Sequence, residues 1–191
     1  MSTFSSLRLP ACTFLLTVCL AAGPALADKL SEYANARFPV VKGYGGVVVP
    51  PAAVMHADKA QRYQIVVETT SEAPDPSKPN PSLERAARLV NLLAQDGVRP
   101  KPGDIVVIIH GKATPLVLND TKYRARFQVT NPNLELIQRL KAAGVSVNVC
   151  SQALVGENIA VADVDGRVQV DVAGMTTLAT LQLKGYALLP D

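Results

Sequence analysis

The amino-acid sequence predicts an α/β protein, a single-domain three-layer sandwich in which helices flank a mostly parallel sheet. Two observations predict this class. Apolar runs typical of buried strands alternate with segments of helical spacing along residues 63–191, and this alternation favours parallel strands joined by helices. Two of the helical segments also share one start and stop pattern, since each begins at Asn-Pro and ends at Gly-Val.

The first half of the domain predicts two strands and the helix between them. Residues 64–68 form a β-branched run that predicts the first strand. Asn80 is expected to cap a helix with Pro81 at its first position, and Gly97 is expected to end it. Residues 104–109 form a continuous apolar strand, of the kind buried on both faces of a parallel sheet.

The second half repeats the pattern after an irregular stretch that includes residues 122–127. Asn131-Pro132 is expected to cap a helix that ends at Gly144. Right-handed connections should then join four further elements to the sheet. These are strands at residues 145–149, 168–172 and 186–189, and a helix over residues 176–184.

Residues 1–27 are predicted to be a signal peptide, which places the mature protein in the periplasm. Arg8 supplies a positive charge, residues 13–22 are apolar, and Ala25-Leu26-Ala27 is a cleavage site of the small-x-small type. A membrane anchor is the main alternative, but Gly23-Pro24 interrupts the apolar run well short of the roughly 20 residues that span a bilayer.

A lipoprotein is a second alternative, because Cys19 lies where a lipidation box would have its cysteine, but the preceding Val18 is bulky for such a box. Cleavage before Asp28 leaves a soluble chain of 164 of the 191 residues, enough for one core. Residues 28–62 lack periodicity and are expected to form an N-terminal arm across the domain, with a short strand at residues 47–49.

Charge and cysteine content narrow the function classes. The formal net charge is +3, without basic runs, so neither nucleic acid nor a membrane surface is an expected partner. Cys12 and Cys19 leave with the signal peptide, so that Cys150 is the only thiol of the mature chain and no intramolecular disulfide can form.

His110 and Cys150 are the candidate catalytic residues, because each directly follows a predicted strand at the edge where α/β proteins place their sites. Cys150 at the start of a turn or helix can react as a thiolate, with His110 tuning it or delivering protons. The alternatives are a buried, inert cysteine and a histidine bonded to a loop carbonyl. Cys150, His56 and His110 provide too few ligands for the usual metal sites, so no metal is expected. No cofactor is expected either.

The segment from Asn131 to Leu140, and then Gly144-Val145 and residues 147–154 around Cys150, resembles the DsrE/DsrF-like sulfur-relay family, in particular its exported branch. Ile109-His110-Gly111 and the ending at residues 178–186 are similar to the same branch. The resemblance implies a compact α/β sandwich that forms homo-oligomers, trimers or hexamers, with the cysteine near a subunit boundary. It also implies that Cys150 carries sulfur as a persulfide and passes it to an acceptor protein.

Two departures separate this chain from the relay members, which are cytoplasmic and have basic residues after the cysteine. This chain is predicted to be exported, and residues 151–162 contain no Lys or Arg. Two hypotheses follow: a sulfurtransferase-like sulfur carrier, and a non-catalytic homo-oligomeric binding module in which Cys150 is structural. Apolar segments at residues 159–162, 178–189 and 47–54 favour assembly under either hypothesis.

Overall fold

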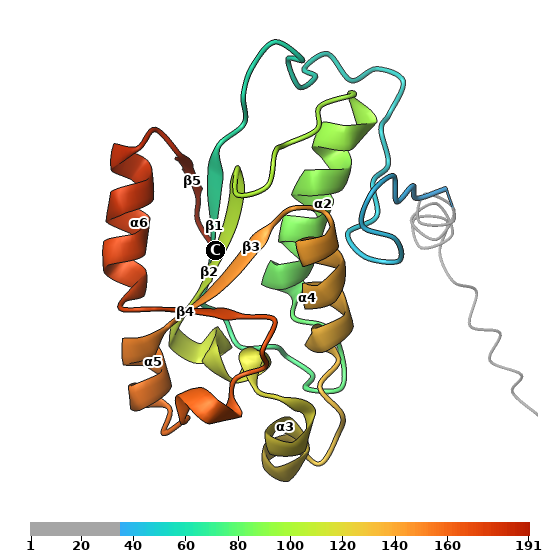
Figure 1. Ribbon diagram of the computed structural model, residues 1–191. Coiled ribbons are helices and arrows are strands. Elements are labelled where there is room, and N and C mark those ends of the chain that lie inside the picture. Colours follow the sequence, from blue (N-terminus) through green and yellow to red (C-terminus); the bar gives the residue numbers. More distant parts are fainter. Residues whose placement is uncertain (1–34) are drawn as a thin grey trace, which may run out of the picture. The chain divides into compact units, whose positions relative to one another are not determined.

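The computed structural model describes residues 35–191, so the predicted signal peptide and the first residues of the arm lie outside it. Five strands form one sheet in the order β4-β3-β2-β1-β5, and all of its pairings are parallel (Figure 1). The predicted α/β class is confirmed. The strands are β1 (Ile65–Thr69), β2 (Ile105–Ile109), β3 (Ser146–Cys150), β4 (Gln169–Asp171) and β5 (Ala187–Leu189).

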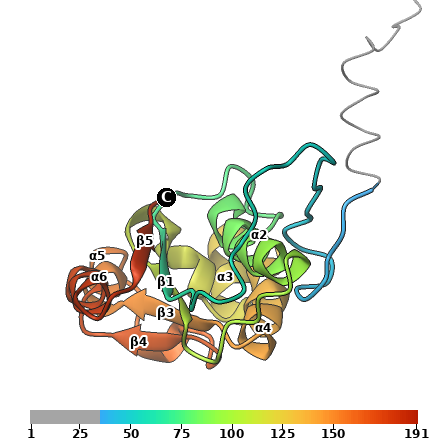
Figure 2. The same ribbon diagram turned by 90° about the horizontal axis from the view of Figure 1, so that it is seen from above.

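Helices cover both faces of the sheet, which gives the predicted three layers (Figures 1 and 2). Helices α2 (Pro81–Gln95) and α4 (Asn133–Ala142) pack on one face, and α6 (Gly174–Leu183) packs on the other. The larger core cluster lies under α2 and α4, where alternate strand residues such as Val67, Val107 and Val149 are fully buried. A smaller cluster lies under α6.

Short helices gather where the sheet's strands end. They are η1 (Gly111–Val117), α3 (Asp120–Phe127), α5 (Ser151–Gly156) and η2 (Val161–Asp163). The prediction of an irregular stretch over residues 122–127 is wrong, since these residues lie in α3. Tyr123 is the one buried residue of α3, so the helix has no apolar stripe that a periodicity analysis could detect.

Buried asparagines join the starts of the two helices that share the Asn-Pro pattern. Asn80 caps α2 as predicted, because its side-chain oxygen accepts hydrogen bonds from the backbone N–H of Ser82 and Leu83. Helix α4 begins at Asn133, whose N–H donates to the side chain of Asn131. The side-chain oxygen of Asn133 in turn accepts from the Asn80 N–H at 2.7 Å, which ties the two helix starts together.

The arm from residue 35 to residue 62 lies against α2 as expected, but the predicted strand at residues 47–49 is not formed. Val47 makes a single antiparallel bridge with Arg37, and this bridge does not extend into a strand. Val41 of the arm is fully buried in the core, which shows that the arm covers apolar surface within this subunit.

Asn91 of α2 holds the arm in place. Its side-chain oxygen accepts from the backbone N–H of Val40 and Val41, and its NH2 group donates to the carbonyls of Val41, Tyr44 and Gly45. Gly45 has φ +59°, and a Cβ there would lie 2.2 Å from the backbone nitrogen of Arg88. Only glycine therefore lets the arm approach α2 this closely.

The end of β5 is tied to the loop after β1 through Asp191. Its carboxylate accepts hydrogen bonds from the backbone N–H groups of Thr70 and Ser71 and from the Ser82 hydroxyl. Burial by itself would raise the pKa of Asp191, but these hydrogen bonds outweigh burial and hold that pKa well below its usual value. No helix within residues 35–191 is long and apolar enough to span a membrane.

Replacing Asn91 by alanine should release the arm and lower the free energy of unfolding by about 2 kcal/mol, because buried backbone groups lose their partners. Chemical denaturation measures the loss, and limited proteolysis within residues 40–60 measures release of the arm. The control is Leu92→Ala, at the neighbouring exposed position. Equal protection of the arm in the two variants would contradict the assignment.

Candidate functional site

Three adjacent strands bring polar side chains to one cavity at the carboxyl edge of the sheet. Glu68 lies near the end of β1, His110 follows β2, and Cys150 is the last residue of β3. All three line a cavity of about 340 Å³, which Gly174 and Leu178 of α6 close from the other side. The structure thus brings the two sequence-predicted residues, His110 and Cys150, to one place and adds Glu68.

His110 is held in a fixed orientation by β1. Its backbone N–H donates to the carbonyl of Thr69 at 3.0 Å, and its Nε2 lies 3.0 Å from Oε1 of Glu68. An ionised carboxylate can only accept a hydrogen bond, so Nε2 carries the proton in this pair. In the neutral ring Nδ1 is then the unprotonated nitrogen, which is free to act as a base. The alternative considered from the sequence, a bond from the His110 ring to a loop carbonyl, is not formed by Nε2, which is bonded to the Glu68 side chain.

Cys150 is buried, with 7% of its surface exposed, and is the one free cysteine among residues 35–191. It lies between the end of β3 and the start of α5, at the strand-to-helix junction that the sequence predicted. A Cβ added to Gly174 would lie 3.4 Å from the Cys150 Cβ and 3.4 Å from Cδ2 of His110. Gly174 therefore packs against both residues and leaves the space that the cavity needs.

Glu68 and Gly174 were not among the residues that the sequence pointed to. Glu68 ends an apolar run, and a carboxylate at the end of a buried strand is a signal that could have drawn attention to it. Gly174 has no such signal, because its contacts with His110 and Cys150 arise only when α6 folds onto the sheet.

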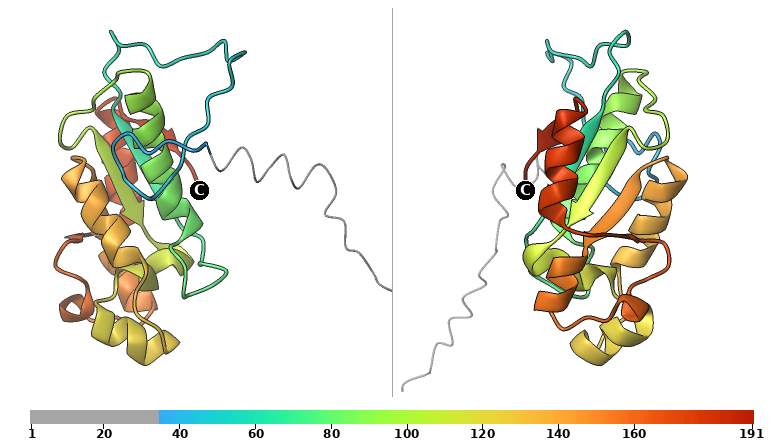
Figure 3. Two further views of the ribbon diagram at one scale, coloured as in Figure 1. Left: turned by 90° about the vertical axis from the view of Figure 1, so that its right-hand side faces the viewer. Right: turned by 60° about the vertical axis from the view of Figure 1, so that its left-hand side comes forward.

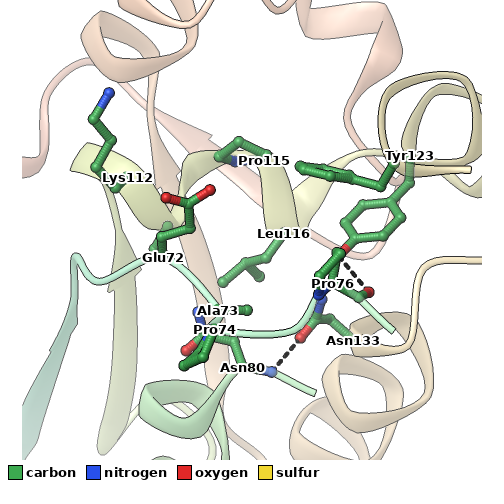
Figure 4. A pocket seen from close by; sticks show the side chains of 12 residues that line it. Glu72, Ala73, Pro74, Pro76, Asn80, Lys112, Pro115, Leu116, Tyr123 and Asn133 are labelled. Carbon is green, nitrogen blue, oxygen red and sulfur yellow. Dashed lines mark hydrogen bonds between the residues drawn. The ribbon is translucent and has the colours of Figure 1, made fainter. Parts of the chain in front are cut away.

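A larger hollow of about 570 Å³ lies between the loop after β1 and the segments η1 and α3 (Figure 4). Its walls are mainly apolar, with Pro74, Pro115 and Tyr123 among them, and Glu72 and Lys112 also line it. Neither Cys150 nor His110 lines this hollow. It offers room for an apolar ligand but contains neither the thiol nor the imidazole.

His56 takes no part in either cavity. Its Nδ1 lies 2.9 Å from Oδ1 of Asp96 at the end of α2, and a hydrogen bond to that carboxylate raises the pKa of His56. Within residues 35–191, no group of three or more His, Cys, Asp or Glu side chains is arranged to hold a metal ion.

A family model described as the DsrE/DsrF-like family matches residues 61–190. The chain belongs to this family. The match spans the three strand ends that form the cavity, and the resemblance seen around Cys150 is thereby confirmed at the level of the family. No curated protein matches the chain.

Two solved structures are similar to this DsrE/DsrF-like chain. One is a protein of unknown function, MTH1491 from Methanobacterium thermoautotrophicum, with 21% identity and a TM-score of 0.48. The other is the YchN protein from E. coli, with 16% identity and a TM-score of 0.46. Each likeness covers 68% of this chain and 99% of the other.

Replacing Glu68 by glutamine should let His110 exchange its ring proton between the two nitrogens, because an amide can donate as well as accept. Long-range ¹H–¹⁵N correlation spectra should show an Nε2–H ring in the parent protein and a mixture of tautomers in the variant. The free energy of unfolding should fall by about 1 kcal/mol. Glu72→Gln, which leaves the pair intact, serves as the control. One unchanged tautomer in Glu68→Gln would contradict the assigned pairing.

Proposed function

We propose that this protein is an exported sulfurtransferase-like sulfur carrier, in which Cys150 holds sulfane sulfur as a persulfide. The observation that carries the proposal is the position of Cys150 in a cavity beside the Glu68–His110 pair. A lone thiol in a compartment that oxidises thiols favours a retained chemical role. Membership of the DsrE/DsrF-like family supports sulfur transfer as the chemistry.

The proposed transfer is a thiol exchange without net oxidation. The Cys150 thiolate attacks the outer sulfur of a donor R–S–SH, so that a Cys150–S bond forms and the donor's S–S bond breaks. The products are Cys150–S–SH and R–S⁻. An acceptor thiolate on a partner protein then takes the outer sulfur in the same way and regenerates the Cys150 thiolate. His110 accepts the thiol proton and returns it to the leaving thiolate.

Incubation of the folded protein with polysulfide should add about 32 Da, the mass of one sulfur atom, on Cys150. Peptide mass spectrometry locates the adduct, and Cys150→Ser is the matched variant that should gain none. His110→Gln should still fold and should accept sulfur about a hundredfold or more slowly, within the range by which a proton-transferring side chain accelerates a reaction. A folded protein without any adduct, whose thiol resists alkylation, would refute the proposal.

The second candidate function is a non-catalytic binding module with Cys150 as a packing residue. The burial of Cys150 and the larger, thiol-free hollow near Pro115 favour it. Under this function, Cys150→Ala lowers the free energy of unfolding by about 1 kcal/mol and changes no sulfur-dependent phenotype. A stable Cys150→Ala variant that fails only in sulfur metabolism would instead support the carrier.

The proposal includes periplasmic localisation after cleavage of residues 1–27, and assembly into a homo-oligomer, a trimer or hexamer. Assembly is supported by apolar side chains that the subunit leaves exposed on β4, α6 and the short helices near the strand ends. The exposed fractions of Val172, Met175 and Leu183 are 79%, 81% and 90%. Soluble monomers rarely expose large apolar patches, whereas symmetric oligomers bury them between subunits.

Light scattering on the chain beginning at Asp28 should give a mass of three or six subunits at micromolar concentration. Two substitutions on α6, Met175→Lys and Leu183→Lys together, should lower that mass because they place charges where subunits would meet. The matched control is Met55→Lys with Ala60→Lys, two exposed positions of the arm outside the apolar segments. If the parent protein keeps the mass of one subunit as its concentration is raised, assembly is ruled out.

A further inference from the structure

The face of the sheet that carries Cys150 also carries a second polar group, on β3 and β4 beside α6 (Figure 3). Asn148 lies two residues before Cys150, and alternate residues of a strand point to the same face. Asp171 of β4 is paired in register with Cys150. The carboxylate of Asp171 accepts hydrogen bonds from the NH2 group of Asn148 at 2.9 and 3.0 Å and from the Thr177 hydroxyl at 2.8 Å.

Asn148 has a side-chain oxygen without a hydrogen-bond partner, although the residue is only 8% exposed. The orientation of its amide is determined by Asp171, because the carboxylate can only accept and so must face the NH2 group. The oxygen is therefore an unused buried acceptor. Such atoms are uncommon, and a ligand that donates a hydrogen bond would satisfy this one.

This acceptor and the thiol belong to adjoining hollows. Asn148 and Asp171 line a hollow of about 500 Å³, together with Thr177 and Leu181. The hollow next to it is the Cys150 cavity, and residues 172–181 contribute alternately to both. Residues two apart on a strand are about 6.5 Å apart, and paired strands are about 4.8 Å apart. One small molecule can therefore reach both Cys150 and the Asn148–Asp171 pair.

Apart from His110, which is paired with Glu68, the ionisable side chains that charge these two hollows are of one sign. Glu68 and Asp171 are carboxylates, and neither hollow is lined by Lys or Arg. Carboxylates repel anionic sulfur donors such as thiosulfate and attract a cation at the same distance. An ammonium group also brings three N–H donors, which suit the oxygen of Asn148 and the carboxylate of Asp171.

We propose that the sulfur donor of Cys150 is the persulfide of a small aminothiol, whose ammonium group binds at Asn148 and Asp171. The inference rests on the proposed sulfur-carrier function and specifies its substrate class. The Cys150 thiolate attacks the outer sulfur of ⁺H₃N–R–S–SH, the S–S bond breaks, and the aminothiolate leaves with its ammonium still bound beside Asp171. Atoms and electrons balance, since one sulfane sulfur moves from one thiolate to another.

Three donors with the same S–SH group test the proposal: the persulfides of cysteamine, 2-mercaptoethanol and 3-mercaptopropionate. Because their leaving thiols differ in pKa, each rate is divided by the rate of the same donor with a free small thiol in solution. They carry a positive charge, no charge and a negative charge beside the same S–SH group. The rate at which Cys150 gains sulfur, followed by quenched mass spectrometry, should fall in that order. The cysteamine rate should exceed the mercaptopropionate rate by about tenfold or more at low salt, and the ratio should shrink as salt screens the charges.

The Asp171→Asn variant removes the charge and keeps the size of the side chain, so the ratio of the cysteamine rate to the mercaptopropionate rate should fall toward one. Asp163→Asn is the matched control, because Asp163 pairs with Lys122 and lines neither hollow. This control should keep the parent ratio. The three-donor series on the parent protein remains decisive if Asp171→Asn does not fold.

The outcomes separate the two proposals. Equal rates from the three donors, or a faster rate from the anionic donor, would overturn the aminothiol assignment and leave the carrier function standing. Absence of sulfur on Cys150 with all three donors would overturn the carrier function itself.

Discussion

Parallel pairing of β1, β2 and β3 is the constraint on which the rest of the structure depends. These strands have mostly apolar side chains and are buried from both sides, so they pair where burial is greatest, in the middle of the sheet. The carboxyl ends of parallel strands lie at the same edge of the sheet. The last residues of neighbouring strands are therefore close together there. Glu68, His110 and Cys150 meet for this reason, although 82 residues separate the first from the last.

The two faces of the sheet are covered unequally, and the two hollows beside Cys150 and Asn148 lie on the less covered face. Helices α2 and α4 together bury one face in a large apolar core, while the other face has only α6. Polar side chains at Asn148 and Cys150 point toward the less covered face. A fully packed face would leave neither hollow, since protein interiors are as dense as organic crystals.

Buried asparagines connect distant segments of the chain through hydrogen bonds. Asn91 binds the arm to α2, and Asn133 joins the starts of α2 and α4. Each uses both ends of its amide, so that backbone groups in loops are satisfied without secondary structure. These hydrogen bonds hold the arm against α2 and fix the starts of α2 and α4 relative to each other.

The sequence by itself determined the α/β class, the order along the chain of the five strands and of the three helices that flank the sheet, and the cap at Asn80. It also placed His110 and Cys150 at strand ends. These features depend on periodicity and capping, which are local properties of short segments. They could be predicted because each is encoded within about fifteen residues.

Only the tertiary structure decided which side chains surround Cys150. Glu68 and Gly174 reach it through strand order and the folding of α6 onto the sheet, and neither is set by local pattern. Helix α3 was not predicted because Tyr123 is its one buried residue. The predicted strand at residues 47–49 is not formed because a single bridge, between Val47 and Arg37, joins it to another described segment. The polar pair of Asn148 and Asp171 likewise exists only once β3 and β4 are in register, since hydrogen bonding between distant segments requires their backbones to be paired.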